Sequence, residues 1–590
     1  MGLSSTFHDP AVAIVGPDGK VLFAEAVERY LQDKRGFQAP PDHLLRMPEL
    51  LKQYAEPDAE IVGAVSFSEL SLRLVELSAA FDMSPLRVVF RRLGKLIDKN
   101  SFHDDHSWPH PGWKTLRDLA RACLLMVGTG LAGTRELTRP VQLRRYNHHL
   151  THAALGCYSS PFKDAVCAVI DGFGEFGSTA FYSYRNGRIE LLHRPRALFN
   201  VERPSLGFFY GLICGLCGFD PLKGEEWKVM GLAPYGRVDP TLYGMLKSLI
   251  KVGDLHLVAG LPVEEEKRLL KQLKERRRPP GAAPIEAANI ACTGQQVFAD
   301  LMGELLQQLS KKGVSSNLVL CGGCALNSSY NGRILGEGAF QRLHVPSAPS
   351  DDGNSVGAAL LAYVEDHPGA PPPQQLMSPY LGSGISRETH DNLLRFNRSP
   401  RLRHLPGAVV PETAKLLAQG KIIGWMQGRA EFGPRALGNR SILADPRSPD
   451  MKDRINGRIK FREEYRPFAP SILHECGPEY FENYQMSPYM ERTLVFRQEV
   501  RAKVPAVVHV DGTGRLQSVT AELAEKFYRL IREFYALTGV PLLLNTSFNI
   551  MGKPIIHSVE DAMGLFHTTG LDALVIDDIL IEKEEAPQVC

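Results

Sequence analysis

The chain has 590 residues, of which 44% are hydrophobic and 23% are charged, and its formal net charge is +2. This length exceeds what one hydrophobic core usually supports, so at least two domains are expected. The near-neutral charge argues against binding to bulk nucleic acid or to a membrane surface. No apolar run approaches the ~20 residues of a membrane-spanning helix, and the N-terminus MGLSSTFHDP lacks the charged and apolar regions of a signal peptide, which predicts a cytoplasmic protein.

The ten cysteines are too few for a disulfide scaffold in a chain of this length and are typical of a reducing compartment. Two CxxC pairs are present, Cys214/Cys217 and Cys321/Cys324. A zinc site needs four converging ligands, whereas these pairs lie in the apolar and glycine-rich contexts LICGLCGF and LVLCGGCAL. We therefore interpret these cysteines as small buried residues.

The first part of the chain contains one pattern twice. Residues 3–29 read as a polar loop, a strand, a tight GPDGK turn and a second strand. Residues 165–195 again read as a strand, a Gly/Ser loop, a strand, an Asn-Gly turn and a strand. Two copies of one unit indicate an internally duplicated α/β fold, in which polar loops at the strand ends face each other across a ligand-binding cleft.

The domain boundaries follow from composition. Residues 70–145 carry apolar residues at spacings of three and four, which predicts a helical insertion packed on the cleft; a lid or a pocket for an acceptor substrate is the alternative. Residues 367–386 are rich in proline and predict a stiff linker. The first domain is therefore expected to span residues 1–366, and the second residues 387–590.

A metal site is suggested by YNHHLTHAALGCY. His148 and His152 are four residues apart, so a helix places both imidazoles on one face. Such a pair is more often structural when it stands alone. Here the next strand ends at Asp171, a candidate third ligand, and the segment 350–353 (SDDG) offers a fourth. Mixed His and carboxylate ligands suit iron or another borderline divalent metal.

Two strand ends carry candidate anion-binding groups. After the apolar run of residues 318–320 come Gly322 and Gly323, and a helix expected near Ala325 would bring its N-terminus to a phosphate or nucleotide. An apolar strand at residues 540–544 ends in the hydrogen-bonding groups of Asn545, Thr546, Ser547 and Asn549. The alternative for that second loop is a plain Asx/Ser turn.

The most basic stretch spans residues 421–471. An apolar strand leads into a loop that has two glycines and the cations Arg429, Arg435 and Arg440, and a second group of cations follows with Lys460, Arg462 and Arg466. Arginine presents a planar fork to phosphate oxygens, lysine supplies a point charge, and glycines allow backbone N–H groups to approach a ligand. This predicts a polyanion site, with a solvated basic face as the alternative.

In combination these motifs resemble the NodU/CmcH-type O-carbamoyltransferases, which modify antibiotics, Nod factors and related natural products. The resemblance covers nearly the whole chain and rests on eight motifs that occur in the family's order: NHHLTHAA, VIDGFGE, WKVMGLAPYG, CGGCALN, SDDGNSVGAA, EFGPRALGNRSILADPR, KFREEYRPFAPS and NTSFN. It implies a first domain of the duplicated actin-like ATPase (ASKHA, Kae-type) class and a YrdC-like second domain. The second domain would form carbamoyl adenylate from carbamoyl phosphate and Mg²⁺-ATP, and the first would pass the carbamoyl group to a hydroxyl of a small molecule.

The resemblance also implies roles for individual residues. The implied catalytic residues are His8 and Lys34, the latter as a contact to the carbamoyl intermediate. The implied iron ligands are His148, His152, Asp171 and Asp351, with Asp352 as the rival for the last position. The residues implied to bind carbamoyl phosphate and ATP in the second domain are Arg435, Lys460, Arg466, Ser547 and Asn549. Those implied to bind the nucleotide or adenylate in the first domain are Lys228, Gly322, Gly323 and Asn327.

Other functions stay open at this point. Carbamoyl transfer to tRNA is disfavoured by the charge balance, and transfer to a protein cysteine is disfavoured because no further cysteine array is present. An actin-like ATPase acting as a regulator would hydrolyse ATP without carbamoyl phosphate. Neither a nucleic acid nor a membrane is expected as a partner, and the protein is expected to be a monomer or a homodimer.

Overall fold

The computed structural model describes residues 1–584 except 6–7, 38, 57, 74–126, 128–129, 132–140, 176, 195–203, 371–375 and 398. Most of the helical insertion expected at 70–145 therefore lies outside the described residues, as does the centre of the linker.

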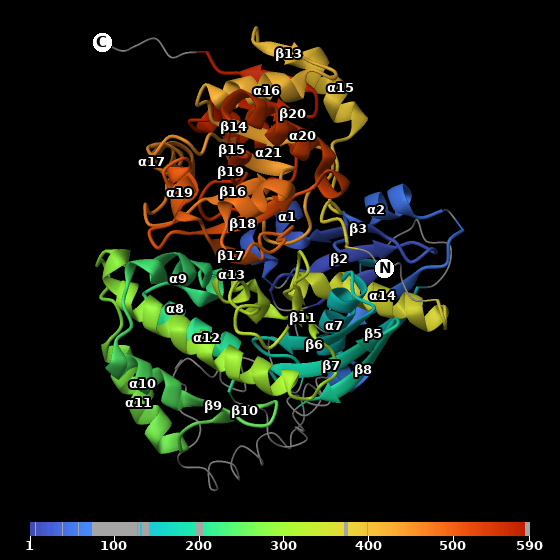
Figure 1. Cartoon of the computed structure of the whole chain (residues 1–590). Helices are drawn as coiled ribbons and strands as arrows, with labels where there is room; N and C mark the ends of the chain where they lie inside the picture. The colour runs from blue at the N-terminus through green and yellow to red at the C-terminus, as the bar shows by residue number, and fades with distance from the viewer. Residues whose placement is uncertain are drawn as a thin grey trace.

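The first domain contains two five-stranded sheets with the same strand order (Figure 1). One has the order β3-β2-β1-β4-β5, built from β1 (Gly2–Ser4), β2 (Ala11–Val15), β3 (Val21–Ala26), β4 (Val62–Ser66) and β5 (Gln142–Tyr146). The other has the order β8-β7-β6-β11-β12, built from β6 (Asp164–Ile170), β7 (Thr179–Arg185), β8 (Arg188–His193), β11 (Asn317–Cys321) and β12 (Arg342–His344). In each, three antiparallel strands precede two parallel ones. The predicted α/β class is confirmed.

Two helices pack between these sheets and carry the site residues. They are α7 (His148–Tyr158) and α14 (Asn354–Asp366), which contact each other along their length. The helices approach closely because Gly357 has no side chain: a Cβ there would lie 1.9 Å from the Thr151 carbonyl oxygen. This packing brings the N-terminal ends of the two helices to the same place.

Strand β6 is buried on both faces, as its continuous apolar sequence predicts. Alternate residues face the helix pair on one side and a helical layer on the other. That layer is drawn in green in Figure 1 and consists mainly of α8 (Leu206–Leu216), α9 (Trp227–Leu232), α10 (Pro240–Leu249), α11 (Val263–Glu275) and α12 (Ala288–Ser310), with the small hairpin β9 (Ile250–Val252) and β10 (Leu257–Ala259). Shorter helices of this domain are α1 (Val27–Leu31), α2 (Met47–Tyr54) and α13 (Ser328–Asn331).

The second domain is built on one mixed nine-stranded sheet with the order β13-β21-β20-β14-β15-β19-β16-β18-β17. Its strands are β13 (Leu402–His404), β14 (Ile423–Met426), β15 (Arg440–Ala444), β16 (Ala469–Leu473), β17 (Arg492–Val495), β18 (Thr513–Val519), β19 (Leu542–Ser547), β20 (Ala573–Ile576) and β21 (Ile579–Glu582). Its helices are α15 (Arg387–Phe396), α16 (Val409–Ala418), α17 (Met451–Ile455), α18 (Gly477–Tyr480), α19 (Gln498–Arg501), α20 (Ala521–Thr538) and α21 (Val559–Thr568).

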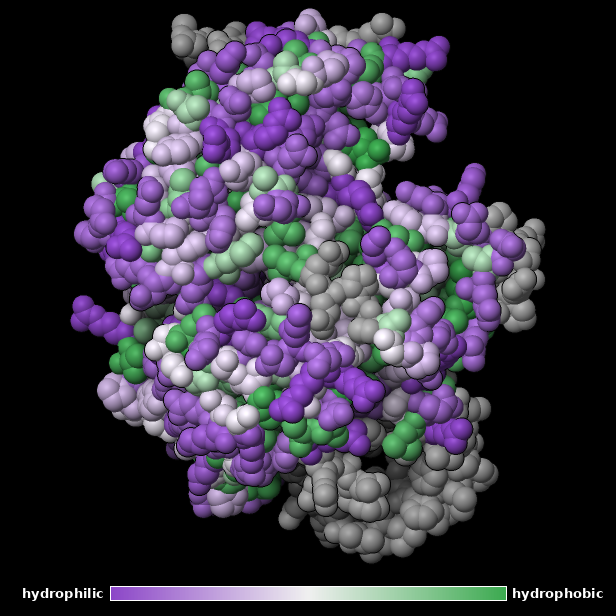
Figure 2. Space-filling model, turned by 45° about the vertical axis from the view of Figure 1, so that its right-hand side comes forward, coloured by the Kyte–Doolittle hydropathy of each residue, from purple (hydrophilic) through white to green (hydrophobic). Residues whose placement is uncertain are grey.

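The molecular surface is largely polar. On the face shown in Figure 2, hydrophilic residues predominate and hydrophobic ones occur in small scattered groups. Among the described helices, none combines the length and the apolar character needed to cross a lipid bilayer.

The two domains are joined by polar contacts around α1, which lies at their junction in Figure 1. Arg29 Nη2 donates to the Gly433 carbonyl (2.7 Å), and Gln32 Nε2 donates to the Ile555 carbonyl (3.1 Å). Glu25 on β3 is 5% exposed; it accepts a hydrogen bond from Ser383 of the linker and faces His557 Nδ1 of the second domain at 3.3 Å.

Replacing Glu25 by glutamine is expected to destabilise the protein in a pH-dependent way. Burial disfavours the Glu25 carboxylate, but His557, Arg46 and Ser383 outweigh it and lower the pKa of Glu25 to about 2 from the ordinary 4.5. Because the pKa of Glu25 is lower in the folded state, the ionised carboxylate contributes its full stabilisation to the folded protein above pH 4.5. This contribution is lost as the pH falls towards 2. We expect Glu25→Gln to lower the free energy of unfolding by about 1–3 kcal/mol at pH 7.

Urea denaturation of both proteins at several pH values measures this effect. The difference in free energy of unfolding between wild type and Glu25→Gln should be constant from neutral pH down to about pH 5 and should then become smaller. Glu49→Gln is the matched control, because Glu49 also contacts Arg46 (2.7 Å) but its side chain is 63% exposed. Its effect should stay below about 0.5 kcal/mol. Equal stability of wild type and Glu25→Gln at pH 7 contradicts the prediction.

Candidate functional site

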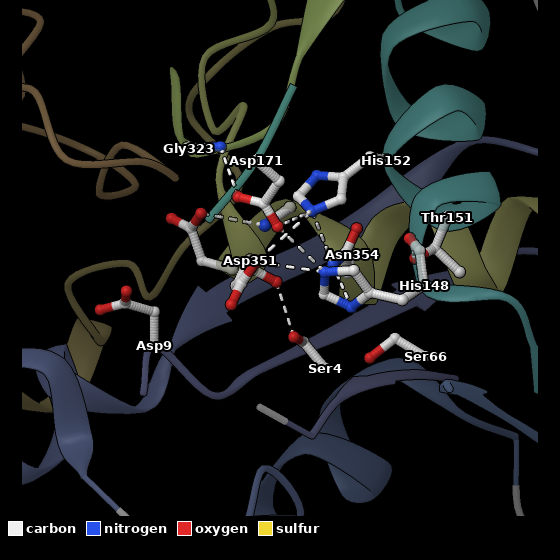
Figure 3. A network of polar contacts seen from close by, with 12 residues as sticks. Ser4, Asp9, Ser66, His148, Thr151, His152, Asp171, Gly323, Asp351 and Asn354 are labelled. Carbon is white, nitrogen blue, oxygen red and sulfur yellow. Dashed lines mark hydrogen bonds and ion pairs between the residues drawn. The ribbon is translucent and has the colours of Figure 1, made fainter. Parts of the chain in front are cut away.

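The first group of site residues is assembled from strand and helix ends. The helix α7 begins at His148, where the Asn147 side chain accepts a hydrogen bond from the Leu150 N–H (3.1 Å). His148 and His152 are both fully buried on one face of this helix, as their spacing predicts. Asp171 follows β6 directly, and Asp351 opens the short turn ahead of α14. Figure 3 shows the four side chains pointing towards one another.

The geometry of this His/Asp cluster, defined as His148, His152, Asp171 and Asp351, suits a metal ion. His148 Nε2 lies 3.3 Å from Asp171 Oδ2 and 3.5 Å from Asp351 Oδ1. His152 Nε2 lies 3.7 Å and 3.4 Å from the same two oxygens. For bonds of about 2.1 Å, neighbouring ligands of a tetrahedral or octahedral metal lie roughly 3.0–3.4 Å apart. Within the described chain, the buried Asp351 Oδ1 has no hydrogen-bond partner, which also fits a cation at this point.

Neighbours hold the Asp171 carboxylate and the Asp351 backbone in place. The Gly323 N–H donates to Asp171 Oδ1 (2.8 Å), and Ser4 Oγ donates to the Asp351 carbonyl (2.6 Å). Asn354 Nδ2 lies 3.1 Å from His152 Nε2, a contact that the sequence reasoning missed although Asn354 belongs to the SDDGNSVGAA motif. Gly323, expected to contact a phosphate, thus uses its N–H within the cluster.

The charges in the cluster stabilise one another. Burial disfavours the charged form of His152, but Asp171 and Asp351 raise the pKa of His152 to about 10. Burial also opposes ionisation of Asp171, yet the two histidines hold the pKa of this carboxyl well below its usual range. A divalent cation would replace the imidazolium as the partner of the carboxylates.

Asp351 and Asp352 differ in orientation. Asp351 carries the oxygen that lies near both imidazoles, whereas Asp352 Oδ1 accepts the Gly353 N–H (3.0 Å). Burial, with the nearby charges of Asp9 and Glu28, raises the pKa of Asp352 to about 7. Asp351 is therefore the member of the pair that belongs to the His/Asp cluster.

His8 borders this cluster. Its Nδ1 lies 2.8 Å from Asp9 Oδ2 and 3.7 Å from Asp351 Oδ2. Asp9 is itself held by Arg35 Nη2 (3.2 Å). The sequence reasoning missed Asp9 and Arg35, because they pair across 26 residues of chain. His8 is partly exposed and so can reach a substrate beside the cluster.

A second group of site residues lies where the two domains meet. Lys34 Nζ is 5.9 Å from the ring centre of Trp227, and the Arg466 guanidinium lies 3.9 Å from the same ring. Lys228 Nζ contacts Glu463 Oε1 (3.4 Å), which belongs to the second domain. Burial lowers the pKa of Lys34. The structure thus brings Lys34 and Lys228 of the first domain together with Arg466 of the second, around Trp227, which the sequence reasoning had not singled out.

The polar loop of the second domain holds a lysine. Lys460 Nζ donates to Asn549 Oδ1 (2.7 Å) and to the Asn549 carbonyl (3.0 Å), and Ser547 Oγ donates to Asn549 Oδ1 (2.8 Å). These three predicted residues therefore form one cluster. The expected end of the preceding strand at residue 544 is wrong: β19 continues to Ser547, because its polar residues pair with β15. Asn545 is buried and donates to Ser471 Oγ (2.9 Å).

The cations of the basic stretch divide into two kinds. Within the part of the chain that the structure describes, Arg429 and Arg440 donate to backbone carbonyls alone, those of Leu22, Leu381, Gly382, Ser383, Gln427, Gly428 and Asn439. The N–H groups of Leu437, Asn439 and Arg440 all donate to Glu431 Oε1. The expectation that this loop offers its N–H groups to a ligand is therefore wrong for these three, because an internal carboxylate occupies them.

A basic cluster is formed by Arg435, Lys460, Arg462 and Arg466 of this stretch together with Arg515 of β18. Within the described residues, the guanidinium of Arg435 has no carboxylate partner, and the positive charge of Arg515 is close enough to repel it. Burial, reinforced by Arg515, holds the pKa of Arg435 well below its usual range. Burial and the neighbouring Arg462 and Arg466 likewise hold the pKa of Lys460 well below its usual range. Among the described residues, Glu463 is the acid that contacts this cluster, through Arg466 Nη1 (3.0 Å), so most of the positive charge is left for an anionic ligand.

The other expected residues have contacts within the first domain. Gly322 has a φ of +86° and donates its N–H to the Pro349 carbonyl (2.8 Å). The Asn327 side chain caps α13 by accepting the Tyr330 N–H (3.0 Å), and this helix begins at Ser328 rather than near Ala325. The cysteines of both CxxC pairs are buried free thiols, as predicted.

Two family models match this chain. Residues 119–360 match the carbamoyltransferase N-terminus and residues 414–583 the carbamoyltransferase C-terminus. The uncharacterized protein sll1178 of Synechocystis is 31% identical over 636 residues, which cover 100% of this chain and 97% of that protein. The nodulation protein NolO of Bradyrhizobium diazoefficiens is 37% identical over 458 residues, 75% of this chain and 79% of NolO. A structural likeness to full-length HypF has a TM-score of 0.27 at 14% identity over 41% of this chain and 46% of HypF, and adds nothing to the assignment. The chain therefore belongs to the carbamoyltransferase family and is an enzyme that transfers carbamoyl groups.

Proposed function

We propose that this protein is an ATP-dependent O-carbamoyltransferase that forms carbamoyl adenylate in one domain and transfers the carbamoyl group to a small-molecule hydroxyl in the other. The observation that carries the proposal is the presence, on one chain, of two separate sites with complementary chemistry. The basic cluster has an excess of cations and suits phosphate-rich substrates. The His/Asp cluster with His8 suits metal binding and proton transfer.

The domain roles follow from this division. We assign residues 1–366 to a duplicated actin-like fold, supported by the two sheets of identical strand order. We assign residues 387–590 to a YrdC-like domain that binds carbamoyl phosphate and Mg²⁺-ATP.

The first half-reaction would take place at the basic cluster. Water converts carbamoyl phosphate into carbamate and phosphate; a carbamate oxygen then attacks the α-phosphorus of ATP, and pyrophosphate leaves. Arg435, Lys460 and Arg466 would hold the phosphates and neutralise the charge that develops on the leaving groups. Ser547 and Asn549 fix Lys460 at the strand end.

The second half-reaction would take place beside His8. The acceptor oxygen attacks the carbamoyl carbon, AMP leaves, and His8 accepts the hydroxyl proton; Asp9 holds the His8 ring by its Nδ1. Lys34 and Lys228, with Gly322, Gly323 and Asn327 nearby, would line the path of the adenylate. A divalent metal, Fe²⁺ as the ligand set suggests, held by His148, His152, Asp171 and Asp351, would polarise the carbamoyl oxygen as a Lewis acid.

Pyrophosphate release from ATP by the purified enzyme, with and without carbamoyl phosphate, tests the proposal. We expect release to require carbamoyl phosphate in the wild type and to persist in His8→Ala, whereas transfer to an acceptor alcohol is lost in that variant. Hydrolysis of ATP to ADP regardless of carbamoyl phosphate would contradict the proposal and indicate an actin-like ATPase. Carbamoylation of tRNA or protein instead of small alcohols would change the acceptor class alone.

A further inference from the structure

A second group of potential metal ligands lies in the second domain, away from the proposed catalytic residues. His390 is on α15, His404 ends β13, and Asp578 is in the two-residue connection between β20 and β21. In Figure 1, α15 and β13 lie at the top of this domain, whereas α7 with the His/Asp cluster lies in the other domain.

The backbone fixes the positions of these three residues. His404 pairs with Ile579 in the β13–β21 ladder, and the Leu405 N–H donates to the Asp578 carbonyl (2.8 Å). The neighbouring Asp577 is held separately, because the Gly428 N–H donates to its Oδ1 (2.9 Å) and Lys526 Nζ donates to its carbonyl (2.9 Å). The Asp578 carboxylate contacts the two imidazoles instead.

The side chains converge on one point that solvent can reach. His390 Nε2 lies 2.7 Å from Asp578 Oδ1, and His404 Nε2 lies 3.0 Å from Asp578 Oδ2. The side chains are 20%, 42% and 29% exposed for His390, His404 and Asp578, and their ligand atoms all lie within 4.8 Å of one another. Two imidazole nitrogens, one carboxylate and an open position for water form a ligand set that Zn²⁺ commonly takes.

A nearby carboxylate favours the ring form that metal binding requires. To offer the Nε2 lone pair, neutral His390 must carry its proton on Nδ1. His390 Nδ1 lies 3.7 Å from Asp391 Oδ1, so this carboxylate favours a proton on Nδ1. A carboxylate behind a histidine ligand is a common outer partner of metal sites.

We propose that His390, His404 and Asp578 form a binding site for a borderline divalent cation of the Zn²⁺ class. The bound ion joins α15 and β13, the first elements after the linker, to the β20–β21 hairpin near the end of the chain. Its role is structural, since none of its three ligands belongs to the His/Asp cluster or to the basic cluster, and it is independent of the proposed carbamoyl chemistry.

Zn²⁺ titration of the chelator-treated full-length protein by calorimetry tests the proposal. We expect two equivalents to bind the wild type and one to bind either His404→Ala or His390→Ala, with carbamoyl transfer unchanged. His152→Ala should lose the other equivalent. Asp391→Asn keeps all three ligands and should weaken the binding of Zn²⁺ to His390, His404 and Asp578 by about 10- to 100-fold.

The matched control is His567→Ala, which removes an exposed histidine of α21 in the same domain and should keep two equivalents. Circular dichroism of each variant establishes that it is folded, and Asp391→Asn tests the site without removing a ligand. Wild-type stoichiometry and affinity in both His404→Ala and His390→Ala overturn the proposal. The proposal is also overturned if the His152→Ala variant binds no Zn²⁺ at all.

Discussion

Replacing Arg435 by methionine is expected to abolish carbamoyl-phosphate-dependent pyrophosphate release without lowering the thermal stability of the protein. Arg435 faces Arg515 and, among the described residues, has no carboxylate partner, so its charge opposes folding until an anion binds. Methionine keeps the apolar stem and removes the charge. Because a single arginine at a transferring phosphoryl group contributes about 10³-fold or more to the rate, a loss of that size is expected. The measurements are the initial rate of pyrophosphate release and the thermal midpoint.

Arg440→Met is the matched control, because Arg440 follows the same loop as the first residue of β15. The Arg440 side chain is fully buried and donates hydrogen bonds to four backbone carbonyls, so its loss leaves those acceptors unpaired. We expect this variant to lose about 3 kcal/mol or more of stability. If Arg435→Met unfolds as easily as Arg440→Met, the assignment of Arg435 to the anion site is wrong.

Replacing His152 by alanine is expected to abolish carbamoyl transfer while pyrophosphate release persists. His152 Nε2 lies between the carboxylates of Asp171 and Asp351, so its loss removes one of the four proposed metal ligands. Without the metal, transfer should fall by about 10²- to 10⁴-fold. Chelator treatment of the wild type should have the same effect, and metal added back should restore the wild type but not the variant. Metal content and both half-reactions are measured on the same preparations.

The neighbouring His149 provides the control for this variant. It lies on the same helix and is also buried, but burial and the nearby His148 lower the pKa of His149 to about 3, so it is neutral at pH 7. His149→Ala is expected to cost stability through the cavity that it leaves, yet to retain the metal and transfer activity. A metal-free His149→Ala, or a His152→Ala that keeps its metal, contradicts the assignment of the cluster.

Much of the fold follows from local sequence. The Asn186-Gly187 turn between β7 and β8 was predictable because both residues adopt positive φ angles, of 46° and 83°, which asparagine and glycine tolerate best. The spacing of His148 and His152 determined their common orientation in the same way, because both residues lie within one helix. The α/β class likewise follows from apolar strands such as β6, whose sequence alone indicates burial on both faces.

The selection among similar residues was decided by tertiary structure. Three arginines of one loop look alike in the sequence, but Arg429 and Arg440 are occupied by carbonyls of segments that fold against them from up to 407 residues away. Arg435 has no such partner among the described residues. The tertiary structure also decided between Asp351 and Asp352. Adjacent residues of a turn point in different directions, and only the packing of α7 against α14 determines which of the two reaches the histidines.

The sequence by itself thus determined the residue types available at each strand and helix end, because hydrophobic periodicity and turn chemistry act over a few residues. Only the tertiary structure decided which of those groups meet. Asp9 with His8, Trp227 with Arg466, and His390 with Asp578 are separated by 1, 239 and 188 residues, respectively. Even the adjacent pair depends on Arg35 to hold Asp9 in place. Contacts over such distances depend on the relative placement of whole sheets and domains, which no local pattern encodes.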